Sequence, residues 1–191
     1  MTSTLTAAFA DPVTDAQRCF RAVLDAMARP GRLHRIDGLA PPPGLTSSAA
    51  AVLLTLVDPE TPLWLDPTAE PARDWIAFHC GAPVVPDSAE AAFGLALALP
   101  DFAGFFPGTH EGPEASATLI VQVDSLSAGR QYRLSGPGLR EPASLMVDGL
   151  PADFAERWKA NHALFPCGID LVLCAGDTLT ALPRSVTVEE A

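Results

Sequence analysis

The stretch RLSGPGL, residues 133–139, is the part of this chain that comes nearest to an anion-binding pattern. A dinucleotide-binding turn needs G-x-G-x-x-G between a strand and a helix, so that backbone amides at the helix N-terminus meet a pyrophosphate. Only the first G-x-G is present, and the residues that follow, LREPASLMV, do not indicate a helix. The G-K-[ST] of a P-loop is absent from the sequence. The pattern therefore favours a glycine-proline turn after a strand over a phosphate cradle.

Arginines near this stretch are better candidates for binding an anion. Eleven of the twelve basic residues are arginine. A planar guanidinium suits bidentate contact with phosphate or carboxylate. The same groups suit ion pairs at a subunit interface, because the chain carries twenty-three acidic residues. We favour pairing at an interface or surface over ligand binding. The candidate binding or assembly residues are Arg130, Arg133, Arg184 and Asp170.

His79 is a further candidate, because its neighbour Cys80 could form a thiol and base pair with it. Neighbouring residues on a helix point in different directions, so we favour a half-buried histidine near a helix end. The four histidines lack metal-binding spacing, and the four cysteines form no C-x-x-C pair. We expect free buried thiols and no metal, and the sequence contains no self-contained catalytic constellation.

A second basic cluster, Arg29, Arg32, His34 and Arg35, follows the first predicted helix. Cations near the last turn of a helix interact favourably with the negative end of its dipole. We interpret this cluster as a solvated turn that complements the helix end.

Composition limits the class of protein. The 191 residues, 48% of them hydrophobic, fit one domain with a substantial core, residues 1–191. Apolar blocks are broken by nineteen prolines and fourteen glycines, so we expect no membrane span. The net charge of −11 argues against nucleic acid or an anionic membrane as a partner. The N-terminus lacks the pattern of a secretory signal, so we expect the protein in the cytoplasm.

The first predicted helix covers residues 14–28, where TDAQ at the start forms a capping box and Pro-Gly follows the end. Its apolar residues recur at helical spacing and are expected to face the core. These residues are Phe20, Val23, Leu24 and Met27. Further helices are predicted at 47–57, 70–80 and 152–165.

Strands are predicted between these helices. The β-branched run ATLIVQV, residues 117–123, indicates a strand covered on both faces. After a turn in SLSAGR, residues 131–136 would form its apparent partner, and AGDT marks a hairpin near the C-terminus. The remaining predicted strands cover 62–65, 82–85, 93–97, 169–174 and 179–183, and 100–113 is expected to be loop or a helical turn. The alternation predicts an α/β fold with helices packed on a mixed sheet.

Four stretches taken together resemble one known family, the PhnH subunit of the bacterial carbon-phosphorus lyase system. They are DAQRCFRAVLDAMARPG, LLTLVDPETPLWL, ATLIVQVDSLSAGRQYRLSGPGL and FPCGIDLVLCAGDTLTALPRS. The resemblance runs from about residue 11 to residue 188. It implies a three-layer α/β/α sandwich similar to the large domain of type I pyridoxal-phosphate transferases, without that cofactor.

The resemblance also implies partners and a reaction. The family forms homodimers and joins PhnG, PhnI and PhnJ in an assembly that exchanges a phosphonate for adenine on the ribose of ATP. It leaves open whether this subunit only supports the exchange or contributes residues to the exchange site. A stand-alone small-molecule binding protein derived from the transferase fold is the alternative function.

The sequence bears independently on the cofactor. A pyridoxal-phosphate enzyme needs a lysine for its Schiff base, and Lys159 is the single lysine. It lies in ERWK, on a helix whose apolar face is formed by Phe154 and Trp158, so we expect it to face water. We therefore expect the chain to bind no cofactor.

Overall fold

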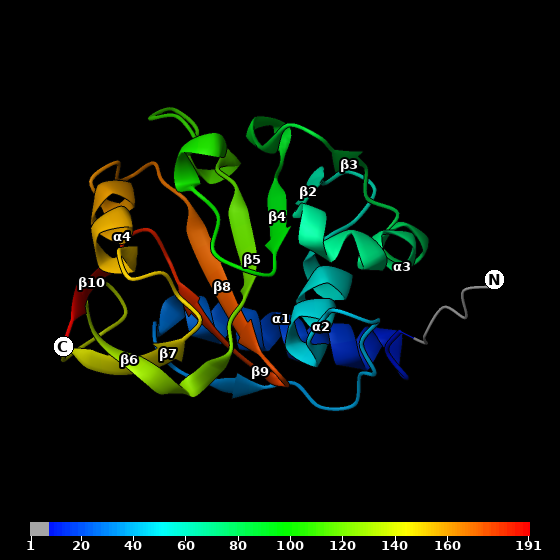
Figure 1. Cartoon of the computed structure of the whole chain (residues 1–191), viewed down its shortest axis with the longest axis horizontal. Coiled ribbons are helices and arrows are strands. Elements are labelled where there is room, and N and C mark those ends of the chain that lie inside the picture. Colours follow the sequence, from blue (N-terminus) through cyan, green and yellow to red (C-terminus); the bar gives the residue numbers. More distant parts are fainter. Residues whose placement is uncertain (1–7) are drawn as a thin grey trace.

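The computed structural model describes residues 8–191, which form two sheets with helices packed against them (Figure 1). The larger sheet has seven strands in the order β1-β9-β8-β5-β4-β2-β3. Its strands are β1 (His34–Arg35), β2 (Leu63–Leu65), β3 (Val84–Val85), β4 (Phe93–Ala96), β5 (Thr118–Gln122), β8 (Asp170–Ala175) and β9 (Thr178–Leu182). The smaller sheet has the order β10-β6-β7 and consists of β6 (Ser125–Ser135), β7 (Ala143–Asp148) and β10 (Thr187–Glu190).

The large sheet is mixed, as the sequence predicts. β2, β3, β4, β5 and β8 pair in parallel, whereas β9 runs antiparallel to both β8 and β1. β8 and β9 form the predicted hairpin, with Gly176 in the left-handed region at φ 56°. Its register places Leu171 opposite Leu182. This register also sets how close Asp170, at the start of β8, lies to Arg184, just after β9.

The central parallel strands β5 and β8 contribute side chains to the hydrophobic core on each face of the large sheet, because successive side chains of a strand point to opposite faces. Ile120 and Val172 belong to the core under the helices, whereas Leu119 and Leu171 belong to the core on the other face. All four side chains are fully buried. The continuous apolar run that predicts a doubly covered strand at 117–123 is therefore confirmed.

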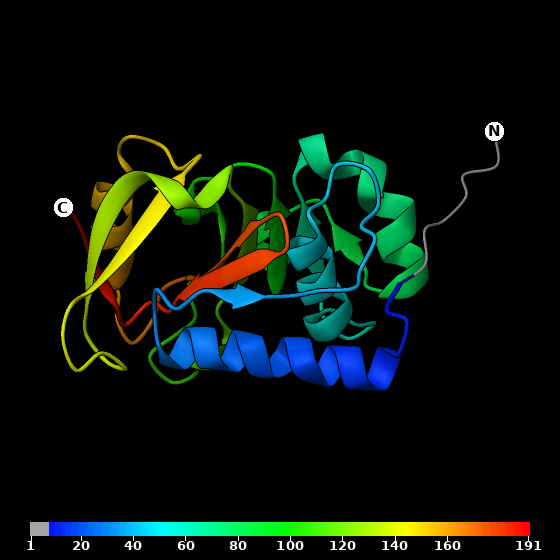
Figure 2. The same cartoon turned by 90° about the horizontal axis from the view of Figure 1, so that it is seen from below.

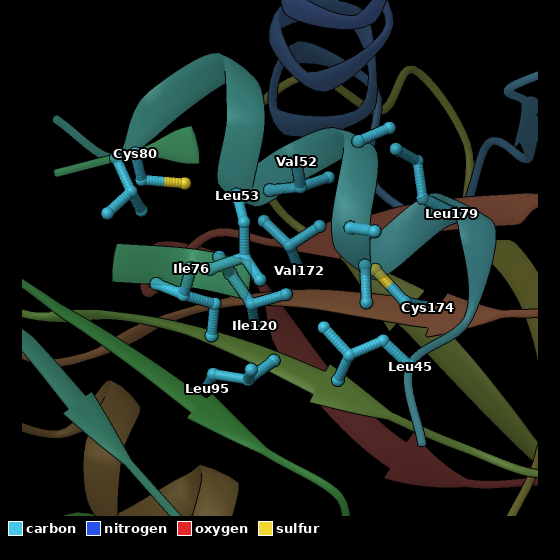
Figure 3. Close-up of a cluster of buried hydrophobic side chains, with 14 of the residues drawn as sticks. Leu45, Val52, Leu53, Ile76, Cys80, Leu95, Ile120, Val172, Cys174 and Leu179 are labelled. Carbon is cyan, nitrogen blue, oxygen red and sulfur yellow. The ribbon is translucent and has the colours of Figure 1, made fainter. Parts of the chain in front are cut away.

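Helices form the layer on one face of the large sheet. They are α1 (Pro12–Ala28), α2 (Ser47–Leu56) and α3 (Arg73–His79), and α3 continues a 3-10 segment, η1 (Pro67–Ala72). Figure 3 shows Val52 and Leu53 of α2 pointing toward Ile120, Val172 and Cys174 of the sheet. Short 3-10 turns complete the connections: η2 (Ser88–Glu90), η3 (Phe102–Gly104) and η4 (Pro113–Ala115).

The small sheet and α4 (Phe154–His162) cover the other face of the large sheet. Trp158 of α4 is fully buried, and its Nε1 donates a hydrogen bond to the Val186 carbonyl oxygen at 2.8 Å. The rings of Tyr132 and Phe154 meet edge to face with centroids 5.4 Å apart. Aromatic contacts thus fix α4 to the small sheet. None of the described helices has the length and apolarity that crossing a membrane requires.

Two predictions for the first helix are wrong. The cap is Asp11, whose carboxylate accepts from the Thr14 amide at 3.2 Å, so the helix begins at Pro12 and TDAQ is not the capping box. Phe20 and Leu24 are 45% and 52% exposed, although Val23 is buried as predicted. The buried face also contains small residues, Cys19 and Ala26, which let α1 approach the structure beneath it closely. The larger side chains consequently point outward.

The apparent strand pair at 117–136 is also wrong. SLSAGR is not a turn but the first half of β6, which is irregular between Ser125 and Arg130. The 131–136 segment pairs with β7 and β10 in the small sheet, not with β5. β7 and β10 were absent from the prediction, because β10 has the sequence TVEE and β7 lies in a segment that shows no helix or strand run.

Candidate functional site

Asp170 and Arg184 lie together, one at the start of β8 and the other just after β9. The Asp170 carboxylate accepts from the Arg184 backbone amide at 2.6 Å and from Nε at 3.1 Å, and Arg184 Nη2 donates to the same carboxylate. The Arg184 side chain is only 14% exposed and the Asp170 side chain 18%. Because Leu171 opposes Leu182 in the hairpin, the register already places these residues side by side. The AGDT turn was the signal that could have predicted the contact.

Neighbouring polar contacts extend this ion pair into a structural network. Arg184 Nη1 donates to the Pro113 carbonyl oxygen at 2.7 Å, and His162 Nδ1 lies 2.8 Å from the Arg184 carbonyl oxygen. Asn161, which is buried, accepts from the Ile169 amide at 2.7 Å and donates to its carbonyl oxygen at 2.9 Å. The Arg184 guanidinium is therefore bonded to the chain's own oxygens, and the network joins α4, β8 and β9. No local motif in the sequence predicts the roles of Asn161 and His162.

Arg130 and Arg133 belong to β6 but do not act together. Arg130 Nη1 donates to the Ala152 carbonyl oxygen at 2.7 Å and to Glu190 Oε1 at 2.6 Å. Arg133 is exposed, and it lies on the outer face of the small sheet because Tyr132 and Leu134 on either side of it are buried. Within residues 8–191, Arg133 forms no ion pair. The two arginines consequently do not converge on one ligand.

The RLSGPGL stretch ends β6 and turns into β7, so the predicted turn is confirmed. Gly136 and Gly138 have φ of 127° and 85°, values that side chains rarely adopt. A Cβ at Gly138 would lie 2.2 Å from the Ala28 carbonyl oxygen at the end of α1. The glycine thus permits close contact between the turn and α1. A phosphate cradle presents N–H groups, whereas the nearest group here is an acceptor oxygen.

His79 ends α3, on the opposite side of the molecule from α4 and β10 (Figure 1). It is half-buried, with its ring centroid 4.8 Å from that of Trp75 and 4.9 Å from that of Phe78. Burial raises the pKa of the Cys80 thiol to about 11, so Cys80 is not a thiolate at neutral pH. The preferred interpretation of a half-buried histidine near a helix end is therefore confirmed. His79 does not share a site with the arginine candidates.

The basic residues after α1 form a cluster that the sequence assigned to a solvated turn. Asp25 is within 3.1 Å of Arg32 Nη1 and 3.0 Å of His34 Nε2, and it also pairs with Arg29. His34 and Arg35 form β1 rather than a turn, and a groove of about 450 Å³ lies between this strand and α1. Burial lowers the pKa of His34, and the Arg32 and Arg29 charges lower it further. The Asp25 carboxylate thus holds the Arg29, Arg32 and His34 side chains together beside the end of α1.

Comparison with known proteins places these elements in a family. The model of the PhnH family, described as bacterial phosphonate metabolism protein, matches residues 7–189. The chain belongs to the PhnH family. The resemblance expected from the four sequence stretches is confirmed.

Two relatives show how far the similarity extends. The chain is 43% identical over 188 residues to the subunit PhnH of alpha-D-ribose 1-methylphosphonate 5-triphosphate synthase from Rhizobium meliloti (strain 1021), covering 95% of this chain and 94% of that protein. It is 29% identical over 176 residues to the putative C-P lyase subunit protein HtxG of Stutzerimonas stutzeri, covering 90% of this chain and 85% of that protein.

The family stretches carry contacts that hold the fold together. The end of the first stretch meets the RLSGPGL turn at Ala28 and Gly138, and the last stretch contains both Asp170 and Arg184. Within the described residues, no group of three side chains is arranged to hold a metal ion. Of the five candidates, the structure brings together only Asp170 and Arg184.

Proposed function

We propose that this chain is a subunit of a carbon-phosphorus lyase assembly that makes a ribose 1-phosphonate 5-triphosphate from ATP and a phosphonate, releasing adenine. The observation that carries the proposal is 43% identity over 95% of this chain and 94% of a protein named as the PhnH subunit of such a synthase. The second relative, named as a C-P lyase subunit, supports the same assignment. The alternative of a stand-alone binding protein has no such support.

Within that assembly, the chain supports the reaction rather than supplying the exchange site. ATP and a phosphonate are anionic, so their site needs positive groups free to meet them. Arg184 is bonded to Asp170, and Arg130 is bonded to Glu190 and to a carbonyl oxygen. Arg133 points away on a separate face. These arrangements favour a structural role for Arg130 and Arg184.

The proposed partners are a second copy of the chain and the PhnG, PhnI and PhnJ subunits, in the cytoplasm. Exposed large apolar side chains include several on α1 and three others, Phe106 in the loop before β5 and Leu164 and Phe165 just after α4, while Phe78 and Met146 are exposed elsewhere. Phe165 and Leu164 are 57% and 49% exposed. Contiguous exposed apolar surface is typical of interaction sites. We assign the Phe106, Leu164 and Phe165 group to the homodimer.

We further propose that residues 1–191 form one domain whose large sheet resembles that of type I pyridoxal-phosphate transferases. The mixed sheet, with β9 antiparallel among parallel strands, supports this resemblance. Lys159 is exposed, as the sequence predicts, and this supports a fold without the Schiff-base chemistry.

Co-expression with tagged PhnI, together with PhnG and PhnJ from the same organism, tests the proposal. The untagged chain should co-purify in a fixed ratio and elute with the complex in size-exclusion chromatography. Failure to co-elute at micromolar concentration and ordinary salt would contradict the proposed function.

A further inference from the structure

The outward face of α1 carries an apolar stripe. Val13, Phe20 and Leu24 are 81%, 45% and 52% exposed, and Leu33 just beyond the helix is 44% exposed. Figure 2 shows α1 along one edge of the molecule, with no described element outside it. Such side chains are buried in most soluble proteins, so a stripe of them on one element indicates a surface that meets a partner.

The apolar residues of the stripe follow the helical period, with the exposed Gln17 between Val13 and Phe20. Phe20 and Leu24 lie seven and eleven residues after Val13, which places all three on one side of the helix. A helix of 17 residues is about 25 Å long, enough to seat a partner helix along its length. The buried residues Cys19, Val23 and Ala26 lie on a different side of the helix. The stripe is therefore not part of the core of this chain.

Positive charge borders the stripe. Between residues 12 and 35 there are five arginines and two aspartates, a net charge of +3, whereas the remaining residues account for −14 of the total of −11. Arg21 is exposed and forms no ion pair within residues 8–191. It lines the groove between α1 and β1 together with Arg18 and Arg32, which are paired there with Asp15 and Asp25. Arg21, one residue after Phe20 and three before Leu24, is thus the guanidinium that lies beside the apolar stripe.

These features discriminate between possible occupants of the face. Two copies of this chain meeting face to face here would bring the same arginines together, which is unfavourable. A free anion would leave the apolar stripe uncovered. A protein surface that is apolar in the centre and carries carboxylates along one side satisfies both the stripe and the arginines. Phenylalanine and arginine are also enriched in the energetically important parts of interfaces.

We propose that the outer face of α1, comprising Val13, Phe20, Leu24, Leu33 and Arg21, docks another subunit of the assembly through an apolar surface edged with carboxylates. The proposal rests on the proposed function, since it assigns that subunit's contact to a particular face. It separates this contact from the homodimer, which uses the surface around Phe165.

The test measures binding of purified variants to a co-expressed PhnG–PhnI–PhnJ complex. Phe20→Asp and Leu24→Asp should weaken binding at least about thirtyfold, as loss of a central interface residue does. The matched control is Phe78→Asp on α3, because Phe78 is 69% exposed and lies outside this face. It should bind like the unaltered chain. If an aspartate variant fails to fold by circular dichroism, Phe20→Ser and Leu24→Ser replace it.

Charge reversal tests the acidic edge of the partner. Arg21→Glu should weaken binding about tenfold or more at low salt and should reduce the salt dependence of the affinity.

The remaining outcomes separate a failure of the proposed function from a failure of the proposed docking face. If the unaltered chain does not bind the complex, the proposed function fails before the face is tested. If the unaltered chain and Phe20→Asp bind equally, the assignment of this face is overturned while the function stands. It is also overturned if Phe20→Asp binds normally but converts a homodimer to a monomer, or if Arg21→Glu leaves affinity and salt dependence unchanged.

Discussion

Replacing Arg184 with alanine should destabilise the folded chain without any ligand being present. The substitution removes the three side-chain hydrogen bonds to Asp170 and the bond to the Pro113 carbonyl oxygen. The Asp170 carboxylate then keeps only the Arg184 backbone amide as its partner among these contacts, in a site that is 18% exposed. A partly buried carboxylate without its counter-charge is costly because water reaches it poorly.

The magnitude follows from the burial of the pair. Removing one partner from a buried ion pair costs about 3–5 kcal/mol, and incomplete burial here places the expected loss near the lower end, at about 3 kcal/mol. For a chain of this size, a loss of about 3 kcal/mol lowers Tm by roughly 6–12 °C. The double variant Arg184→Ala with Asp170→Ala should lose less than the sum of the single losses, with a coupling of about 2 kcal/mol.

Urea unfolding followed by tryptophan fluorescence measures these losses, since Trp158 is fully buried and reports on the core beside α4. The matched control is Arg157→Ala, because Arg157 and Asp153 form an exposed pair with side chains 37% and 48% accessible. Exposed pairs contribute about 0–1 kcal/mol, so this variant should unfold almost like the unaltered chain. If Arg184→Ala stays within 1 kcal/mol of the control, the ion pair does not stabilise the fold, and Arg184 returns as a ligand-binding candidate.

Four further outcomes are expected. Gly138→Ala should cost more than about 3 kcal/mol because its Cβ meets a carbonyl oxygen at 2.2 Å, whereas Gly44→Ala, with similar φ and open space, should cost only about 1 kcal/mol; equal losses in urea unfolding would refute the clash. Cys80 and Cys174, whose pKa burial raises to about 11 and about 12, should resist a thiol reagent at pH 8 until the chain unfolds. Because the unfolded thiols ionise first, the free energy of unfolding should fall as pH rises above roughly 8.5, and a flat profile from pH 8 to 10 would contradict this. The purified chain should show no visible pyridoxal-phosphate band, and a band lost in Lys159→Ala would show the opposite.

The central strands were predictable because a strand buried on both faces has apolar residues at nearly every position. ATLIVQV is apolar and β-branched, and the structure places its core residues in both hydrophobic clusters. The AGDT turn likewise predicted the β8–β9 hairpin, since the glycine occupies a left-handed conformation that the turn requires. Local signals sufficed where local geometry decided the structure.

Local sequence patterns failed to predict the structure where contacts between residues distant in the sequence determine it. β6 pairs with β10, which begins more than fifty residues later, so no local pattern could distinguish this pairing from a hairpin with β5. The burial of α1 depended on which neighbours lay beneath it, and the helical spacing alone assigned Phe20 and Leu24 to the wrong side. Gly138 of the RLSGPGL stretch is explained by its contact with the end of α1, more than one hundred residues earlier in the sequence.

Two of the three arginines form ion pairs, Arg130 at the surface as expected and Arg184 in a largely buried position. The preference for ion pairing over ligand binding agrees with the contacts of Arg130 and Arg184. Those contacts lie within one chain, however, because the hairpin register brings Asp170 to Arg184 and the small sheet brings Glu190 to Arg130. A role in a subunit interface stays a prediction for Arg133.

Adenine release from ATP and methylphosphonate tests the proposed function most directly. The purified PhnG–PhnI–PhnJ complex is incubated with both substrates, with and without this chain, and adenine is measured by chromatography. Adenine release should depend on adding this chain and should survive Arg133→Ala. Full release without the chain, or loss of release in an intact complex containing Arg133→Ala, would contradict the assignment of a required, supporting subunit.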